Sequence, residues 1–255
     1  MPLGRQRRGA VEILVIDREK VANAIDFETS HALANVFDEL EHDDEVRAVV
    51  LTGAGDRVFC AGMDLGAVRR GEADSINLVP GGFAGIVRRD FPFPLIAAVN
   101  GAAVGGGFEI VLACDLVVAA DHATFGLPEV KRGLFAASGG LVRLARRIAP
   151  PAAFELAFTG ETIDAERAER LGLVNRVVER GRALETAIEI GQRIAQNAPL
   201  ALRASKQLLR RSLETSEGEL WELNAKLAAE VLSSEDAAEG AAAFNEKRVP
   251  KWSGR

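Results

Sequence analysis

The chain has 255 residues, of which 48% are hydrophobic, and its formal net charge is −6. This length and composition allow one large domain, or one domain with an appendage. The negative charge argues against nucleic acid as a partner. No apolar run reaches the roughly 18 to 20 residues of a membrane span. No signal-peptide pattern opens the chain, so we expect a cytoplasmic protein with no membrane partner.

The cysteines and histidines show neither disulfide nor metal-ligand spacing. Cys60 and Cys114 both lie in apolar surroundings, so we expect them to be reduced and buried. The three histidines, His31, His42 and His122, are scattered along the chain. The sequence therefore predicts no metal site.

The first two-thirds of the chain alternates strands and helices, which is typical of an α/β fold. "VEILVID" (11–17) is rich in β-branched residues and predicts a strand. Residues 28–41 predict a helix with one apolar face, made by Ala32, Leu33, Val36, Phe37 and Leu40. Further strands are expected at 46–53, 94–101 and 115–121. The apolar strands lack polar alternation, so both of their faces should be covered.

The character of the chain changes near residue 150, where helical segments punctuated by Gly and Pro begin. From residue 200 the pattern predicts helix to about residue 245, with breaks near Gly218 and "SSED". We therefore divide the chain into a core of residues 1–195 and a helical region of residues 196–255. Residues 66–92 favour no regular element, and a loop of that length is usually functional or mobile.

Three glycines, Gly105 to Gly107, stand between a predicted strand and an apolar helical run. Glycine lets a ligand approach the backbone closely, and a helix start leaves N–H groups that can bind an anion or an oxyanion. On the glycines alone, a plain tight turn is the simpler interpretation. A second strand-to-helix turn, "FCAGMDLGAV", would place Gly62 and Met63 at another helix start. Two such starts could form a two-donor oxyanion hole for a carbonyl.

Two glutamates accompany these turns. Glu109 falls in the first turn of the helix after the glycines, and Glu129 follows Pro128 in "FGLPE". Apolar surroundings and a second nearby carboxylate both raise the pKa of a carboxyl group. Two such groups can act as general acid and general base near neutral pH. Taken separately, each glutamate could equally be a helix-terminal charge or a solvated side chain.

Together these segments resemble the enoyl-CoA hydratase/isomerase (crotonase) superfamily over nearly the whole chain. The matching segments are "VFCAGMDL" (58–65), "PLIAAVNGAAVGGGFEIVLACD" (94–115), "ATFGLPEVKRGL" (123–134), "SGGLVRLARRI" (138–148), "LAFTGETIDAERAERLGLVNRVV" (156–178) and "EGAAAFNEKRVPKW" (239–252). The resemblance implies an α/β core of repeated ββα units in a spiral. It also implies C-terminal helices that build a homotrimer or a dimer of trimers.

The resemblance further implies an acyl-CoA thioester substrate, with no cofactor because coenzyme A is part of the substrate. The backbone N–H groups of Met63 and Gly106 would form the oxyanion hole. In the hydratases of the family, the Glu109 position activates water for attack at C3 and the Glu129 position delivers a proton to C2. The addition of water is syn and reversible.

Other positions match family segments that contact CoA or substrate. They are Lys20, Ala22, Ala24, Ala61, Gly62, Asp64, Leu65, Gly105, Pro128, Phe244 and Lys247. Lys20 could meet a phosphate, and Ala22 and Ala24 would line the pocket. In some family members the positions of Phe244 and Lys247 reach CoA from a neighbouring subunit.

One branch of the family, the carnitinyl-CoA dehydratases (crotonobetainyl-CoA hydratases), resembles the chain in "VANAID", "PGGFAG", "GGGFE" and the C-terminal segment. Recognition of a trimethylammonium group would call for aromatic or acidic residues, and the aromatic candidates are Phe83, Phe91, Phe93 and Phe135. Two alternatives stay open. A Δ3,Δ2-enoyl-CoA isomerase commonly keeps the Glu129 position without the Glu109 position, and a non-catalytic member would only bind acyl-CoA. The presence of both glutamates favours the hydratase.

Overall fold

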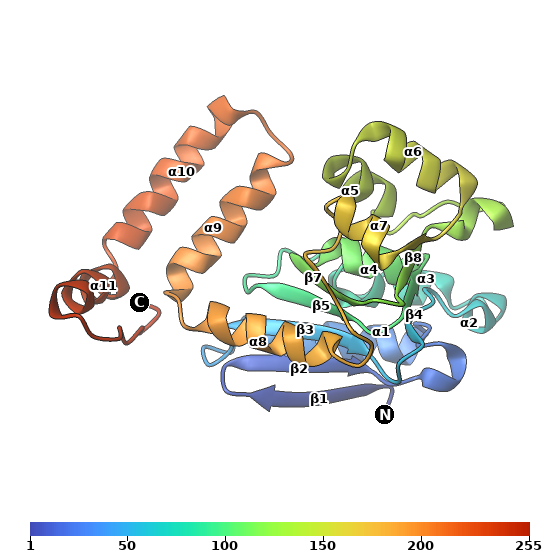
Figure 1. Cartoon of the computed structure of the whole chain (residues 1–255), viewed down its shortest axis with the longest axis horizontal. Coiled ribbons are helices and arrows are strands. Elements are labelled where there is room, and N and C mark those ends of the chain that lie inside the picture. The colour runs from blue at the N-terminus through green and yellow to red at the C-terminus, as the bar shows by residue number, and fades with distance from the viewer.

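A computed structural model of the chain describes residues 1–255 and contains two sheets (Figure 1). The six-stranded sheet has the order β1 (Leu3–Arg8), β2 (Val11–Ile16), β3 (Ala48–Gly53), β5 (Leu95–Val99), β7 (Leu116–Ala120) and β10 (Arg176–Val178). It is parallel except for the β1–β2 pair. The four-stranded sheet has the order β4 (Val58–Cys60), β6 (Ala102–Val104), β8 (Thr124–Gly126) and β9 (Ile163–Asp164). Here only β9 is antiparallel to its neighbour.

The two sheets arise from one repeating unit. In each of the pairs β3–β4, β5–β6 and β7–β8, the first strand enters the larger sheet and the second enters the smaller one. Helical segments follow each pair: α2 (Leu65–Arg69) and α3 (Ala73–Asn77), then α4 (Gly106–Ala113), then the 3₁₀ helix η3 (Pro128–Arg132) and α5 (Gly140–Arg147). This succession confirms the expected spiral of ββα units.

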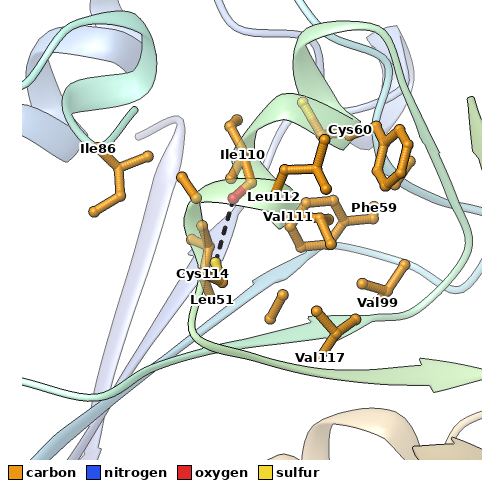
Figure 2. Packing of buried hydrophobic residues seen from close by; sticks show 14 of the residues in the cluster. Leu51, Phe59, Cys60, Ile86, Val99, Ile110, Val111, Leu112, Cys114 and Val117 are labelled. Atoms are coloured by element: carbon orange, nitrogen blue, oxygen red, sulfur yellow. Dashed lines mark hydrogen bonds between the residues drawn. The ribbon is translucent and has the colours of Figure 1, made fainter. Parts of the chain in front are cut away.

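The central strands are buried on both faces, as their sequences predict. Val49 and Leu51 of β3 face the larger apolar cluster, which includes α1 (Phe27–Glu41) and α4. Val50, between them, faces the second cluster under α8 (Ala183–Ala195). Figure 2 shows α4 side chains packed over the strands, together with Cys60 and Cys114. Both cysteines are buried free thiols, as expected.

The sequence did not predict β1, a strand rich in arginine. Arg5 and Arg7 each donate from Nε to the carboxylate of Glu12, over 2.5 and 2.6 Å, and Glu12 is only 1% exposed. The same two arginines also pair with Glu39 and Asp43. The basic strand is therefore held by a carboxylate buried in the neighbouring strand β2. The short strands β4, β6, β8, β9 and β10 were also not predicted from their residues.

Residues 66–92, which favoured no element, contain α2, α3 and the 3₁₀ turn η2 (Phe83–Gly85). One guanidinium ties much of this segment to α1. The Arg89 side chain is 7% exposed and donates to the Gly85 carbonyl (2.7 Å), to Asp38 (2.7 Å) and to Glu41 (2.8 Å). The segment is therefore an ordered part of the core wall.

The helices after β8 were largely predicted. They are α6 (Pro150–Thr159), α7 (Ala165–Arg170), α8, α9 (Pro199–Ser212), α10 (Glu217–Leu232) and α11 (Glu235–Glu246). α9 and α10 form an arm that extends from the core and ends in α11 (Figure 1). Asp115 of the core binds the α9 helix of this arm by accepting hydrogen bonds from Lys206 (2.7 Å) and Arg210 (3.0 Å). The division at residues 195 and 196, with an assembly role for the second part, stays a prediction. No helix has the length and apolarity to cross a membrane.

Gly107 offers a test of how closely the segments around α4 pack. A Cβ at this position would overlap the Cys60 carbonyl group. Overpacking of this kind costs about 1–3 kcal/mol, so Gly107→Ala should lower Tm by at least about 2 °C. Gly218→Ala is the matched control, because an added Cβ there meets nothing within 4 Å. Differential scanning calorimetry of both variants provides the measurement, and equal Tm values would contradict the close contact.

Candidate active site

The turn before α4 requires glycine for conformation and for space. Gly105 has φ 57° and ψ −131°, a left-handed conformation that favours glycine, and its N–H donates to the Gly126 carbonyl over 2.9 Å. A Cβ on Gly106 would lie 2.7 Å from the Phe83 ring and 3.2 Å from the Gly62 Cα. Three distant segments therefore meet at this turn. Because Gly106 is the first residue of α4, its N–H has no acceptor within the helix.

The prediction that Met63 lies at a helix start is wrong. α2 begins at Leu65, and the Asp64 side chain caps it by accepting from the Gly66 N–H (2.8 Å) and the Ala67 N–H. Met63 instead forms a parallel bridge with Ile25. This bridge uses the Gly62 carbonyl and the Asp64 N–H, so the N–H of Met63 itself points away from Ile25.

Contact between the two turns brings these backbone donors to one place. Gly62 has φ 90°, and a Cβ on it would lie 2.8 Å from the Gly106 nitrogen. The residue that follows Gly62 is Met63. The N–H groups of Met63 and Gly106 therefore lie on adjoining turns, and regular structure uses neither of them.

Glu109 lies in the first turn of α4, as predicted, and its side chain is buried with the residue 3% exposed. Its Oε1 accepts from the Gly140 N–H over 2.8 Å. The pKa of Glu109 is raised to about 7, mainly by burial and also by the nearby Glu129 carboxylate, while the Gly140 hydrogen bond opposes the shift. The group can therefore gain or lose a proton near neutral pH.

Glu129 lies in η3, directly after Pro128, and is half-buried. Burial raises the pKa of Glu129 above its ordinary range. Its Oε2 is buried and has no hydrogen-bond partner in the protein. A Cβ on Gly105 would stand 3.3 Å from Glu129 Oε1, and the Glu109 N–H donates to the Gly105 carbonyl over 3.0 Å. Both glutamates therefore adjoin the glycine turn that carries the Gly106 N–H.

The predicted CoA-binding segments near residues 20 and 61 lie together. Ala61 donates its N–H to the Ala22 carbonyl over 3.0 Å. Ala22 has φ 57°, Ala24 is 8% exposed, and Lys20 is exposed in the 3₁₀ helix η1 (Glu19–Val21). The structure thus brings these positions to one side of the Gly62 turn.

Arg18 is a residue of this region that the sequence analysis missed. Its guanidinium pairs with Asp64 (3.1 Å) and with Asp26 (2.7 Å). The Asp64 carboxylate therefore both caps α2 and holds Arg18. Leu65, the next residue, is 56% exposed and free to contact a ligand. The pairing joins residues 46 positions apart, so no local pattern pointed to it.

Phe244 and Lys247 are not brought to the site within this chain. Both are exposed on α11, and Phe244 is 84% exposed. Figure 1 shows α11 at the opposite end of the molecule from α2 and β4. Any contact that these side chains make with CoA would therefore be to the CoA of another subunit.

Two of the four aromatic candidates, Phe91 and Phe93, are core residues. Both rings are buried in the core, with centroids 5.7 Å apart. Arg203 lies over Phe93 and Lys206 lies over Phe91, at 4.6 and 5.6 Å from the centroids. Phe135 is 65% exposed. Of the four phenylalanines, only Phe83 touches the glycine turn.

No group of three or more His, Cys, Asp or Glu side chains is arranged to hold a metal ion.

Comparison with known proteins agrees with this geometry. The enoyl-CoA hydratase/isomerase family profile matches residues 6–255. The carnitinyl-CoA dehydratase of Proteus mirabilis is 44% identical over 253 residues, which is 97% of each chain. An enoyl-CoA hydratase structure from Mycobacterium tuberculosis has a TM-score of 0.95 at 44% identity, covering 100% of this chain and 99% of that one. A carnitinyl-CoA hydratase structure from Mycobacterium avium has a TM-score of 0.79, with the same identity and coverage. The chain belongs to the enoyl-CoA hydratase/isomerase family.

Proposed function

We propose that the protein catalyses the reversible syn addition of water to a 2-enoyl-CoA thioester. One observation carries this proposal: a buried glutamate and a half-buried glutamate flank two backbone N–H groups that regular structure leaves unused. The family and the names of the similar proteins support the same reaction.

The backbone donors would serve the thioester oxygen. Attack of water at C3 of a conjugated thioester moves negative charge onto the carbonyl oxygen. The N–H groups of Met63 and Gly106 would stabilise that charge, and one such donor is worth roughly 3–4 kcal/mol in the transition state. The glycine contacts keep the two donors in place, so little reorganisation is needed during the reaction.

The glutamates would move the two protons. Glu109, ionised, accepts a proton from water while the water oxygen bonds to C3. The C2–C3 π electrons move into the enolate, and C2 then takes the proton of the neutral Glu129 carboxyl. Glu129 ends ionised and Glu109 ends protonated, and proton exchange with solvent restores both. The raised pKa of Glu129 favours its neutral form, and its unpartnered Oε2 leaves that carboxyl group free to donate a proton to substrate.

The same groups would bind the rest of the substrate without a separate cofactor. Lys20 would meet a CoA phosphate, while Ala22, Ala24, Ala61 and Leu65 would line the path to the two turns. Gly62, Gly105, Asp64 and Pro128 would shape the walls. An isomerase that relies on the Glu129 position alone would not need Glu109 buried against the Gly140 N–H, so the geometry favours hydration.

The carnitinyl-CoA dehydratases suggest a head group for the acyl chain. However, enoyl-CoA hydratase structures share the same 44% identity with this chain. Identity therefore does not separate a plain enoyl chain from one with a trimethylammonium group. Crotonobetainyl-CoA and crotonyl-CoA are the two substrates to compare.

We also propose that the protein works as a homotrimer or a dimer of trimers in the cytoplasm, where free thiols stay reduced. The arm of α9 and α10 supports an assembly role, since it leaves Leu209 and Trp221 exposed by 69% and 62%. In the assembly, Phe244 and Lys247 would reach the CoA bound to a neighbouring subunit.

Glu109→Gln and Glu129→Gln should each lower the hydration rate of the better of crotonyl-CoA and crotonobetainyl-CoA by about 10²–10⁴-fold, because each removes one proton transfer. Steady-state loss of enoyl-thioester absorbance measures the rate. Glu155→Gln, at an exposed position on α6, is the control and should keep the wild-type rate. A near-normal hydration rate in either Glu109→Gln or Glu129→Gln would contradict the mechanism.

The kcat/KM for hydration should rise with pH on an acid limb with a midpoint near pH 7. Glu109 must be ionised to accept the proton from water, and its pKa is raised to about 7. The rate should also fall where Glu129 loses its proton, because the neutral carboxyl is the proposed proton donor. Stopped-flow rates from pH 5 to 10 in constant-ionic-strength buffers test this. An acid limb near pH 4, the ordinary glutamate range, would contradict the assignment.

The same raised pKa has a consequence for stability. The folded state holds the Glu109 proton to a higher pH than the unfolded chain, so stability falls as pH rises from about 4.5 to 7. Glu109→Gln should therefore be more stable than wild type at pH 8, by up to about 3 kcal/mol, and the difference should vanish near pH 4. Urea unfolding at both pH values provides the measurement.

Static light scattering should give a mass of three or six chains. Replacing both exposed arm residues, Leu209→Asp with Trp221→Asp, should shift the mass towards the monomer, because a charge in an apolar interface is costly. A clean monomer for the wild-type protein would refute the assembly.

A further inference from the structure

Arg143, on α5, lies close to Glu109 and joins two segments around it. Its half-buried side chain donates from Nη1 to the Ser138 carbonyl over 3.4 Å and from Nη2 to the Val87 carbonyl. Ser138 stands two residues before Gly140, whose N–H holds Glu109. Val87 follows the η2 turn, which carries Phe83 against the glycine turn of α4. One guanidinium therefore links the two walls beside the buried carboxylate.

The two glycines between Ser138 and α5 make room for this arrangement. Gly139 has φ 92°, and a Cβ on it would overlap the Arg143 guanidinium. A Cβ on Gly140 would stand 2.8 Å from Glu109 Cγ. The three residues of this turn therefore have separate parts. The Ser138 carbonyl accepts a hydrogen bond from Arg143, Gly139 leaves space for the Arg143 guanidinium, and the Gly140 N–H donates to Glu109.

We propose that Arg143 is a positioning residue for the hydration reaction. Its fork holds the 138–140 turn, and through it the Gly140 N–H that orients Glu109, while its positive charge favours the ionised carboxylate. This inference rests on the proposed function, since it assumes that Glu109 must be ionised and oriented to activate water.

The electrostatic surroundings agree with this role. The charged groups that act on Glu109 are Glu129 from η3, which raises its pKa, and Arg143 from α5, which lowers it. Arg143 is faced in turn by Arg147 of its own helix, by Arg210 of α9 and by the Cys114 thiol. Burial lowers the pKa of Arg143, yet a guanidinium stays charged at neutral pH. Arg143 is thus a cation that acts directly on Glu109.

A lysine could keep this charge but not the geometry. The guanidinium is planar and presents several donors in a fixed fork, whereas an ammonium is a compact point charge on a flexible stem. Substitution by lysine therefore keeps the positive charge and removes the forked hydrogen bonding that holds the 138–140 turn. Substitution by glutamine removes the charge and leaves one donor group.

The test compares Arg143→Lys, Arg143→Gln and the control Arg146→Gln. Arg146 lies on the same helix, and both arginines line a groove of about 430 Å³ between α5 and α9. Arg146, however, is exposed and pairs only weakly with Glu214 (3.9 Å). The kcat, KM and pH profile of hydration are measured for each. A second readout is the titration of the Glu109 carboxyl by ¹³C NMR, with its resonance identified by its loss in Glu109→Gln.

For Arg143→Gln we expect kcat to fall by about 10–100-fold with little change in KM. The acid limb and the Glu109 titration should both move up by roughly half a pH unit or more. For Arg143→Lys we expect kcat to fall by about 10-fold, while the midpoint of the acid limb stays at its wild-type pH. For Arg146→Gln we expect no change in kcat, KM or the pH profile. An unmoved titration in Arg143→Gln, or a wild-type kcat in Arg143→Lys, overturns the proposal.

Two features keep these outcomes interpretable. If Arg143→Gln does not fold, as judged by circular dichroism, Arg143→Lys decides through its kcat. If the wild-type protein hydrates no acyl-CoA, or Glu109→Gln stays active, the proposed function fails. The NMR titration still reports whether the charge of Arg143 acts on Glu109, so the two failures are distinguishable.

Discussion

The site depends on the close contact between two backbone turns. Gly62 and Gly107 each meet the other turn at distances that leave no space for a Cβ, and Gly106 does the same against Phe83. A side chain at any of these positions would push the turns apart. The N–H groups of Met63 and Gly106, the proposed oxyanion donors, would then move apart, and an oxyanion hole requires its donors about 2.7–3.1 Å from the oxygen.

Once the turns touch, the helix α4 determines where Glu109, the proposed general base, lies. Glu109 is three residues after the first donor, so it occupies the next position on the same helical turn. The apolar residues around it drive α4 into the core and bury the carboxylate with it. Burial is unfavourable for an ionised group, and the Gly140 N–H offsets only part of that cost. Burial of Glu109 therefore lowers the stability of the fold and leaves a carboxyl group that titrates near neutral pH.

Local patterns were enough to predict much of this arrangement. The central strands of the larger sheet, α1, the glycine turn and the position of Glu109 follow from periodicity and from glycine and proline. What the sequence could not show depends on contacts between distant residues. The backbone N–H of Met63 is left without an acceptor because the bridge to Ile25 uses the neighbouring backbone groups, and not because Met63 begins a helix. β1 was missed because its arginines are held by the buried Glu12. Phe91 and Phe93 belong to the core because cations of α9 cover their rings.

The stereochemistry of hydration in D₂O tests the central claim most directly. With Glu109 and Glu129 beside one glycine turn, both new bonds should form on the same face of the double bond. ¹H NMR of the 3-hydroxyacyl product should show one deuterium at C2, syn to the new hydroxyl group, and Glu129→Gln should suppress its incorporation. Anti addition, or deuterium on both faces of C2 at the first turnover, would contradict the account.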